Sequence, residues 1–174
     1  MNFGEIKKHD IADGPGVRVT LFVSGCTHHC EGCFNPETWD FQYGQPFTGA
    51  VAEEILKALS PDYIAGLTLL GGEPLEYANW TALLPLLKEV RARFPHKDVW
   101  CYTGYLFDRD VRDDFCEKWA DMKEFLACLD VVVDGEFVQA KKNISLRFRG
   151  SENQRIIDVQ ESLRAGKVVL WEDA

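Results

Sequence analysis

Short apolar runs rich in β-branched residues alternate along this chain with segments of helical periodicity, and this alternation restricts the possible folds more than any other feature. Runs typical of buried strands occupy residues 17–23, 66–70, 98–102 and 129–133. Amphipathic helical patterns occupy residues 48–59, the stretch from near Thr81 to Val90, and the stretch from Val111 to Leu126. The middle helix is expected to begin near Thr81, so that Pro85 falls close to its first turn. This order predicts an α/β fold with a mostly parallel sheet and right-handed crossovers.

The length of the chain decides between a closed barrel and an open sheet. A closed barrel of eight strand–helix units takes about 250 residues, whereas this chain has 174. Four clear units, with further candidate strands at 146–148, 156–159 and 168–171, fit a partial, open (βα) barrel in a single domain spanning residues 1–174. In such a fold the functional loops lie at the carboxyl ends of the strands.

The charge and the hydropathy of the chain argue against several classes of function. The formal net charge is −9, which argues against a nucleic-acid binder that covers phosphates with Lys and Arg. No apolar run approaches the roughly 18 residues that cross a bilayer, and the amino-terminal stretch lacks the apolar segment of a secretory signal. We therefore expect a cytoplasmic protein without a membrane partner, whose six cysteines are reduced thiols, metal ligands or catalytic groups.

Three of the cysteines lie close together, directly after the first predicted strand. Cys26, Cys30 and Cys33 belong to the sequence CTHHCEGC. Thiolates are the usual ligands of iron–sulfur clusters, and an electron-transfer cluster normally takes four of them. Three thiolates would leave one iron open to bind a substrate, by the logic that separates catalytic zinc sites from closed structural ones. A structural Cys3His zinc site, completed by His28 or His29, remains the alternative at this point.

A second motif, Gly71-Gly72-Glu73-Pro74, ends the next predicted strand and by itself indicates only a turn. Together with the cysteine loop it resembles the radical S-adenosylmethionine superfamily, whose fold is a partial (βα) barrel. The resemblance implies a [4Fe-4S] cluster on the three cysteines, with the amino and carboxylate groups of S-adenosylmethionine chelating the fourth iron. It also implies that Gly71, Gly72 and Glu73 hold the ammonium group of that cofactor.

The residue before the third cysteine departs from the superfamily pattern. Most members have an aromatic residue there, in contact with the adenine, whereas this chain has Gly32. We expect Gly32 and Cys33 to contact the cofactor, and Phe34 to take over part of the aromatic contact.

Further motifs resemble the glycyl-radical-enzyme activases. They are residues 13–18 (DGPGVR) before the first strand, 34–35 (FN) after the third cysteine, and 38–39 (TW) beyond it. Within this group, residues 102–105 (YTGY), 133–137 (VDGEF) and 149–155 (RGSENQR) resemble the activating proteins of anaerobic (class III) ribonucleotide reductase. The alternatives are an activase of another glycyl radical enzyme, such as pyruvate formate-lyase, a radical enzyme acting on a small molecule, and a non-catalytic zinc module.

The resemblance implies a reaction and two partner proteins. A flavodoxin-type reductant would supply one electron through the cluster, which breaks the bond between the sulfur and C5′ of S-adenosylmethionine. The products would be methionine and a 5′-deoxyadenosyl radical, which removes a hydrogen atom from the Cα of one glycine in anaerobic ribonucleotide reductase. Because the cofactors carry the reactivity, no acid–base side chain is required.

Several other residues are candidates for contacts with the cofactors or with a partner. Asp134 ends the fourth strand, where a carboxylate could face the cofactor, although a strand-ending Asp-Gly turn is the favoured interpretation. His28 and His29 are either hydrogen-bonding neighbours of the cluster or solvated loop residues. The stretch 141–155 is basic in an acidic chain. If residues 146–148 form a strand, Arg147 and Arg149 project from one face as a docking site for an acidic partner; a solvated basic loop is the alternative.

The remaining cysteines are expected to be structural. Cys101, Cys116 and Cys128 are widely spaced and do not resemble the close cysteine run of a ferredoxin. We therefore interpret them as buried small hydrophobic residues.

Overall fold

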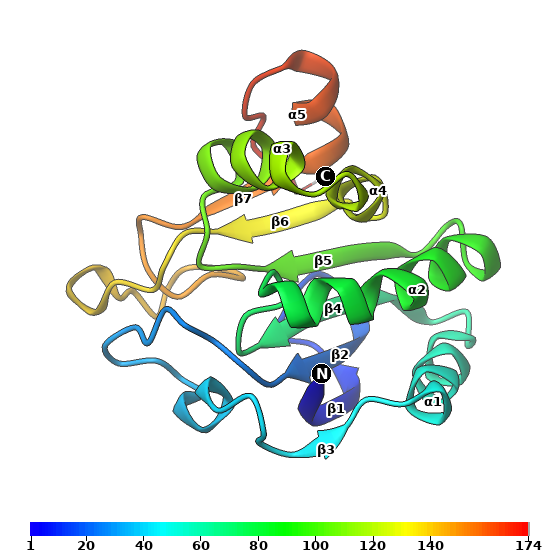
Figure 1. The fold of residues 1–174 in the computed structure, drawn as a ribbon. Coiled ribbons are helices and arrows are strands. Elements are labelled where there is room, and N and C mark those ends of the chain that lie inside the picture. Colours follow the sequence, from blue (N-terminus) through cyan, green and yellow to red (C-terminus); the bar gives the residue numbers. More distant parts are fainter. Residues whose placement is uncertain (174) are drawn as a thin grey trace.

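A seven-stranded open sheet organises the computed structural model, which describes residues 1–173. The strands are β1 (Asn2–Asp10), β2 (Val17–Val23), β3 (Gln45–Pro46), β4 (Ile64–Gly71), β5 (Asp98–Tyr102), β6 (Val131–Asp134) and β7 (Arg155–Asp158). Their order is β3-β1-β2-β4-β5-β6-β7, with β3 and β7 at the edges (Figure 1). β2, β4, β5 and β6 pair in parallel, while β1, β3 and β7 are antiparallel to their neighbours. The predicted mostly parallel sheet is confirmed.

Helical segments follow β3, β4, β5 and β7 along the chain and pack on one face of the sheet. They are α1 (Gly49–Leu59), α2 (Tyr77–Arg93), a π-helical segment (Phe107–Phe115), α3 (Cys116–Lys118), α4 (Asp121–Ala127) and α5 (Val159–Ala165). The Thr48 side chain accepts a hydrogen bond from the Val51 N–H, so it caps α1 as serine and threonine commonly do. Among residues 1–173, no helix is long and apolar enough to cross a membrane.

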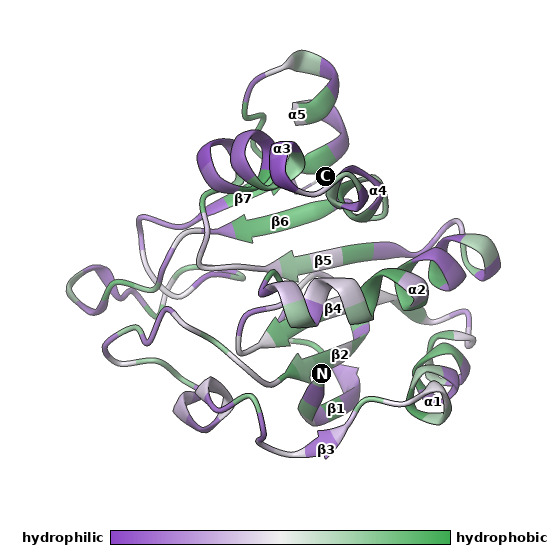
Figure 2. Cartoon of the chain, viewed as in Figure 1, coloured by the Kyte–Doolittle hydropathy of each residue, from purple (hydrophilic) through white to green (hydrophobic). Residues whose placement is uncertain are grey.

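The parallel strands are buried on both faces, which explains their continuous apolar sequences. Successive side chains of a strand point to opposite faces, so Leu69 and Cys101 join the core formed with α1, α2 and α4, whereas Leu70 and Tyr102 line a cavity on the other face. Figure 2 shows these strands as predominantly apolar and the outer surfaces of the helices as more polar. Cys128 also lies in the core, as predicted, whereas Cys116 is only half-buried and packs against that core.

The strands flanking the parallel region differ from the sequence-based prediction. β1 was not predicted, because its sequence NFGEIKKHD is largely polar and only Phe3 and Asp10 are buried. The strand expected at 156–159 is β7, but it runs antiparallel to β6. The strand expected at 168–171 is reduced to one isolated bridge between Leu170 and Ile157.

Two helices also differ from the prediction. α2 begins at Tyr77, four residues before the predicted start, and therefore has Pro85 in its interior. The extra first turn carries Trp80, whose side chain is buried in the core, and this packing stabilises the earlier start of the helix. The single helix expected from Val111 to Leu126 is broken at Trp119, whose backbone is extended. The Trp119 ring packs against Tyr77, Trp80 and Phe115, and this aromatic packing accompanies the break.

Candidate functional site

The three clustered cysteines line one side of a cavity of about 660 Å³ at the carboxyl ends of the parallel strands. Their loop leaves β2 through Gly25, whose φ of 104° belongs to the left-handed region. The loop base is anchored by two backbone hydrogen bonds, from Gly25 N to Thr38 O (2.7 Å) and from Cys26 N to Trp39 O (3.2 Å). The predicted position of the loop, directly after a buried strand, is confirmed.

All three thiols are free. Burial raises the pKa of Cys26 to about 11, and burial together with the Glu136 carboxylate raises the pKa of Cys30. Binding a metal centre to these thiols would therefore release protons. Within residues 1–173, no group of three Cys, His, Asp or Glu side chains is arranged to hold a metal ion.

The glycine-rich end of β4 lies beside the cysteine loop. Gly71 pairs in register with Val23 at the end of β2. Gly72 N donates to Val23 O (2.8 Å), and Glu73 N donates to Gly25 O (2.8 Å). Two motifs separated in the sequence thus form one wall of the cavity, because parallel strands end at the same edge of the sheet.

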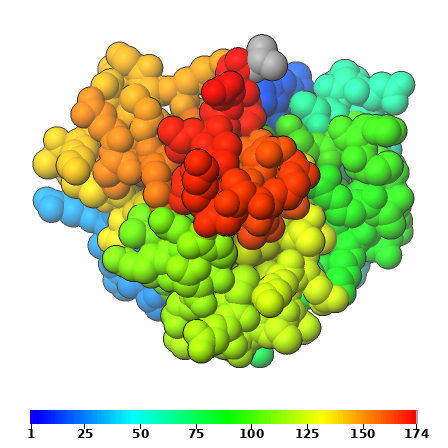
Figure 3. Space-filling view, turned by 90° about the horizontal axis from the view of Figure 1, so that it is seen from above, coloured from blue at the N-terminus to red at the C-terminus, as the bar shows by residue number. Residues whose placement is uncertain are grey.

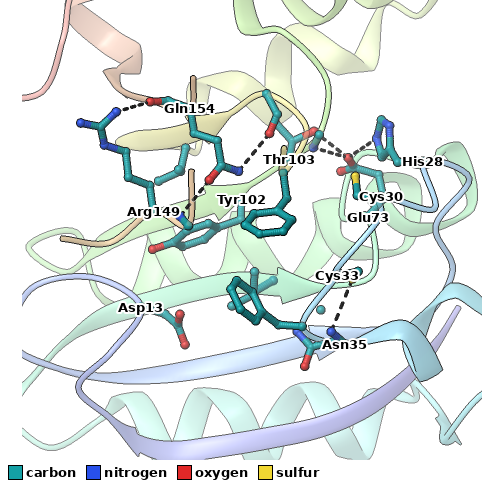
Figure 4. A pocket seen from close by; sticks show the side chains of 18 of the residues that line it. Asp13, His28, Cys30, Cys33, Asn35, Glu73, Tyr102, Thr103, Arg149 and Gln154 are labelled. Atoms are coloured by element: carbon teal, nitrogen blue, oxygen red, sulfur yellow. Dashed lines mark hydrogen bonds and ion pairs between the residues drawn. The ribbon is translucent and has the colours of Figure 1, made fainter. Parts of the chain in front are cut away.

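The Glu73 residue of this wall is only 1% exposed, and both oxygens of its carboxylate accept hydrogen bonds. Oε1 accepts hydrogen bonds from the Thr103 hydroxyl (2.8 Å) and from Gly104 N (2.7 Å), while Oε2 accepts one from Leu75 N (2.9 Å). Figure 4 shows Thr103 and Glu73 converging at the end of the cavity that carries Cys30. Sequence reasoning assigned no role to Thr103 or Gly104, although the YTGY motif directly after a predicted strand was a usable signal.

His28 joins the same network from within the cysteine loop. Nε2 lies 2.8 Å from Glu73 Oε1, and Nδ1 lies 3.2 Å from Glu136 Oε1. Burial alone lowers the pKa of His28, but the two carboxylates outweigh this effect and raise the pKa to about 9. Both ring nitrogens of His28 thus have carboxylate partners. The His29 ring stacks on Trp39, with 4.5 Å between the ring centres. This geometry does not support a Cys3His zinc site.

The aromatic side of the cavity is formed where the cysteine loop meets the segment after β6. Phe34 is 63% exposed, and its ring lies 5.1 Å from that of Phe137 and 5.4 Å below the Lys142 ammonium. Figure 3 shows the yellow-to-orange segment beside the light-blue cysteine loop. Gly32 does not line the cavity: its φ is +76°, and a Cβ there would meet the Gln139 side chain at 1.9 Å. Its predicted contact with the cofactor is therefore not supported by the cavity wall.

Asp134 is fully buried and turned away from the cavity. Its carboxylate accepts hydrogen bonds from Phe107 N (2.8 Å) and from the Arg155 guanidinium (3.0 and 2.5 Å). Its neighbours Val133 and Gly135 line the cavity instead. The Asp134 carboxylate therefore faces Phe107 N and Arg155 rather than the cavity, because the side-chain alternation of β6 directs it to the other face.

The strand predicted at residues 146–148 is absent, because Phe148 has a φ of 63° and the chain bends there. The Phe148 carbonyl accepts a hydrogen bond from the Tyr102 hydroxyl (2.8 Å). Arg149 donates to the Glu152 and Gln154 carbonyls (3.2 and 2.6 Å), whereas Arg147 pairs with Asp173. The two guanidinium groups therefore do not form the paired site that a strand would have produced.

Asp13, from the DGPGVR motif, lies across the cavity from the cysteine loop (Figure 4). Burial, followed by the hydrogen bond with Asp10 and the charge of Asp10, raises the pKa of Asp13 to about 7. Burial also raises the pKa of Asp10, but hydrogen bonds with Asp13 and Thr20 outweigh this effect, so the pKa of Asp10 is lowered. The two carboxyl groups therefore share one proton at mildly acidic pH.

The variant Asp13→Asn is expected to be more stable than the parent protein above pH 7. The pKa of Asp13 is higher than its ordinary value of 3.8, so its stabilising contribution is complete below pH 3.8 and is lost as the pH rises through 7. Asparagine keeps a donor without ionising, and should gain about 1–2 kcal/mol at pH 8 after allowance for solvent screening. Urea unfolding at pH 5 and pH 8 checks this; equal gains at both values would contradict it.

Comparison with known proteins identifies the family to which this chain belongs. Residues 12–157 match the family model described as a 4Fe-4S single cluster domain. The chain is 43% identical over 158 residues to the anaerobic ribonucleoside-triphosphate reductase-activating protein of Enterobacteria phage T4, covering 90% of this chain and 93% of that protein. The protein of the same name from Escherichia coli (strain K12) is 43% identical over 88% of this chain and 96% of its own length. That from Pasteurella multocida (strain Pm70) is 42% identical over 90% and 96%. With its free thiols lining one cavity, the chain belongs to the family of anaerobic ribonucleoside-triphosphate reductase-activating proteins.

Proposed function

We propose that this chain is a radical S-adenosylmethionine activase that generates a glycyl radical on an anaerobic ribonucleotide reductase. The observation that carries the proposal is that the CxxxCxxC thiols and the Gly-Gly-Glu-Pro strand end share one cavity. The relatives named for this activity, at about 43% identity over most of the chain, support the choice of reductase. Neither zinc binding nor another glycyl radical enzyme has a comparable observation in its favour.

The donor set of the cavity fits a [4Fe-4S] cluster with one open iron. Cys26, Cys30 and Cys33 are three free thiols on one wall, and thiolates are the usual ligands of such clusters. Once bound, the cluster and S-adenosylmethionine supply the radical chemistry, for which the protein provides position and exclusion of water. The cavity volume of about 660 Å³ is within the range of small-molecule sites.

The residues around the open position are suited to hold S-adenosylmethionine. Glu73 and the backbone of Gly71 and Gly72 border the cavity next to the cysteines, where a carboxylate can accept hydrogen bonds from the cofactor's ammonium. Phe34 and Cys33 border it on the side of Phe137, where an exposed ring can cover an adenine. Gly32 and Asp134 are left out of this set.

The proposed function carries expectations about the fold, the cellular location and the partners of the chain. The open, mostly parallel sheet is compatible with a partial radical S-adenosylmethionine barrel, and we treat residues 1–174 as one such domain acting in the cytoplasm. We expect a flavodoxin-type reductant as electron donor, and the net charge of −9 favours protein partners over nucleic acid. Arg147 and Arg149 stay candidates for docking an acidic partner, but as separate groups, since each already has its own contacts.

The proposal is tested by activating a purified anaerobic ribonucleotide reductase. Reduced, cluster-loaded protein mixed with S-adenosylmethionine and the reductase is expected to produce a glycyl radical, detected by electron paramagnetic resonance. Omitting S-adenosylmethionine should remove the signal. If the reductase gives no radical signal while pyruvate formate-lyase is activated under the same conditions, the partner would be reassigned within the glycyl radical enzymes.

A further inference from the structure

The His28 imidazole connects two carboxylates that follow different strands of the sheet. Glu73 follows β4, whereas Glu136 follows β6, and the two lie at Nε2 and Nδ1 of the same ring. The ring also packs edge-on against Tyr105, with 4.5 Å between the ring centres. A Cβ on Gly104 would lie 2.7 Å from the ring, so the backbone is shaped closely around it. His28 is therefore held in one orientation, with its side chain only 10% exposed.

Glu136 also reaches the cysteine loop at a second point. While Oε1 contacts His28, Oε2 lies 3.9 Å from the Sγ of Cys30. The Glu136 backbone is fixed by a hydrogen bond from the Asn153 side chain to its carbonyl (2.8 Å). A carboxylate thus stands beside a proposed cluster ligand, with a histidine as its donor on the other oxygen.

Charge and hydrogen bonds near the ligating sulfurs set the reduction potential of an iron–sulfur cluster. A negative charge next to Cys30 disfavours adding an electron and makes the potential more negative. A donor that holds this carboxylate offsets part of the effect. His28 and Glu136 would therefore act in opposite directions on the same property.

We propose that His28 is a positioning residue, whose hydrogen bond to the Glu136 carboxylate offsets part of the negative charge beside Cys30 and so sets the reduction potential of the cluster. This inference rests on the proposed function, because it assumes a cluster on Cys26, Cys30 and Cys33. His29 provides a matched control in the same loop. Its ring stacks on Trp39 and, among the described residues, its side chain makes no hydrogen bond.

The test is a redox titration of anaerobically reconstituted proteins, followed by electron paramagnetic resonance of the reduced cluster. Glu136→Gln is expected to shift the midpoint potential to a more positive value, because a negative charge is removed. His28→Ala is expected to shift it to a more negative value, because the Glu136 carboxylate loses its donor. His28→Gln, which keeps one N–H donor, should restore most of the parent potential, and His29→Ala should leave it unchanged.

The double variant separates a specific coupling from a general disturbance of the loop. In the Glu136→Gln background, His28→Ala should cause a much smaller shift than it does alone. The Glu136 charge is then absent, and the Glu73 carboxylate keeps its hydrogen bonds from Thr103, Gly104 N and Leu75 N. An unchanged potential in Glu136→Gln, or equal shifts in His28→Ala and His29→Ala, would overturn the inference. If the His28→Ala protein does not bind a cluster, the potential of the Glu136→Gln protein tests the inference. The Glu136 side chain is 55% exposed, so its replacement should not impair folding. Parent protein that binds no cluster would overturn the proposed function, whereas equal potentials in loaded proteins overturn this inference alone.

Discussion

The variant Cys30→Ala is expected to bind almost no iron and to lose all cleavage of S-adenosylmethionine. Each of Cys26, Cys30 and Cys33 would be one of only three protein ligands on the cavity wall, so the loss of one leaves two irons of the cluster without a protein thiolate. Iron analysis of anaerobically purified protein should give about four irons per chain for the parent and near zero for each of these variants. Release of 5′-deoxyadenosine under dithionite should fall below detection in parallel.

The other three cysteines provide the controls for this experiment. Cys101 is fully buried in the core on the helical face of the sheet, and Cys116 and Cys128 also pack on that core. Their replacement by alanine removes a small buried group, which costs about 1 kcal/mol of stability and no cluster ligand. If Cys101, Cys116 or Cys128 proved as necessary for iron binding as Cys30, the three-thiolate assignment would be wrong.

The variant Gly72→Val is expected to destabilise the protein by about 3 kcal/mol or more, even without cofactors. A Cβ at position 72 would lie 2.6 Å from the carbonyl oxygen of Gly25 and 2.8 Å from that of Thr38. Both are backbone atoms at the base of the cysteine loop, so they cannot rotate away as a side chain can. Overpacking typically costs about 1–3 kcal/mol, and a rigid backbone neighbour places this site at the upper end. Urea unfolding of the cluster-free protein measures the effect.

A glycine without such neighbours provides the comparison. No atom lies within 4 Å of a Cβ placed on Gly49, the first residue of α1. Gly49→Ala should therefore leave stability unchanged or raise it by about 0.5 kcal/mol through the unfolded state. A Gly72→Val protein that keeps its stability and loses only affinity for S-adenosylmethionine would show that the cofactor, rather than the loop base, is what the side chain crowds.

The parallel part of the sheet could be predicted because of its burial. β2, β4, β5 and β6 lie between the helical core and the cavity face, so their sequences are continuous apolar runs. β1 has one exposed, charged face and no such run. The predicted strand at 146–148 failed for a different reason: its alternating pattern suited a strand, but Phe148 takes a left-handed conformation while its carbonyl accepts the Tyr102 hydroxyl.

Local spacing was enough to find the candidate ligands but not their surroundings. Cys26, Cys30 and Cys33 lie close together in the sequence, and the Gly-Gly-Glu-Pro turn follows the next strand. Both motifs were therefore expected at one edge of the sheet. Thr103 and Glu136, in contrast, reach Glu73 and His28 from positions 30 and 108 residues away along the chain. No periodicity relates residues at such separations.

The amino-acid sequence by itself determined the order of the strands' apolar runs, the loop that carries the thiols, and the family, because these depend on residue types at short spacing. Only the tertiary structure decided which polar groups meet in the cavity. It directed Asp134 to Arg155 and away from the cofactor side, turned Arg147 toward Asp173, and brought His28 between Glu73 and Glu136. The physical reason is that a side chain's partners depend on the twist and register of strands distant in sequence, and on which face of the sheet each residue occupies.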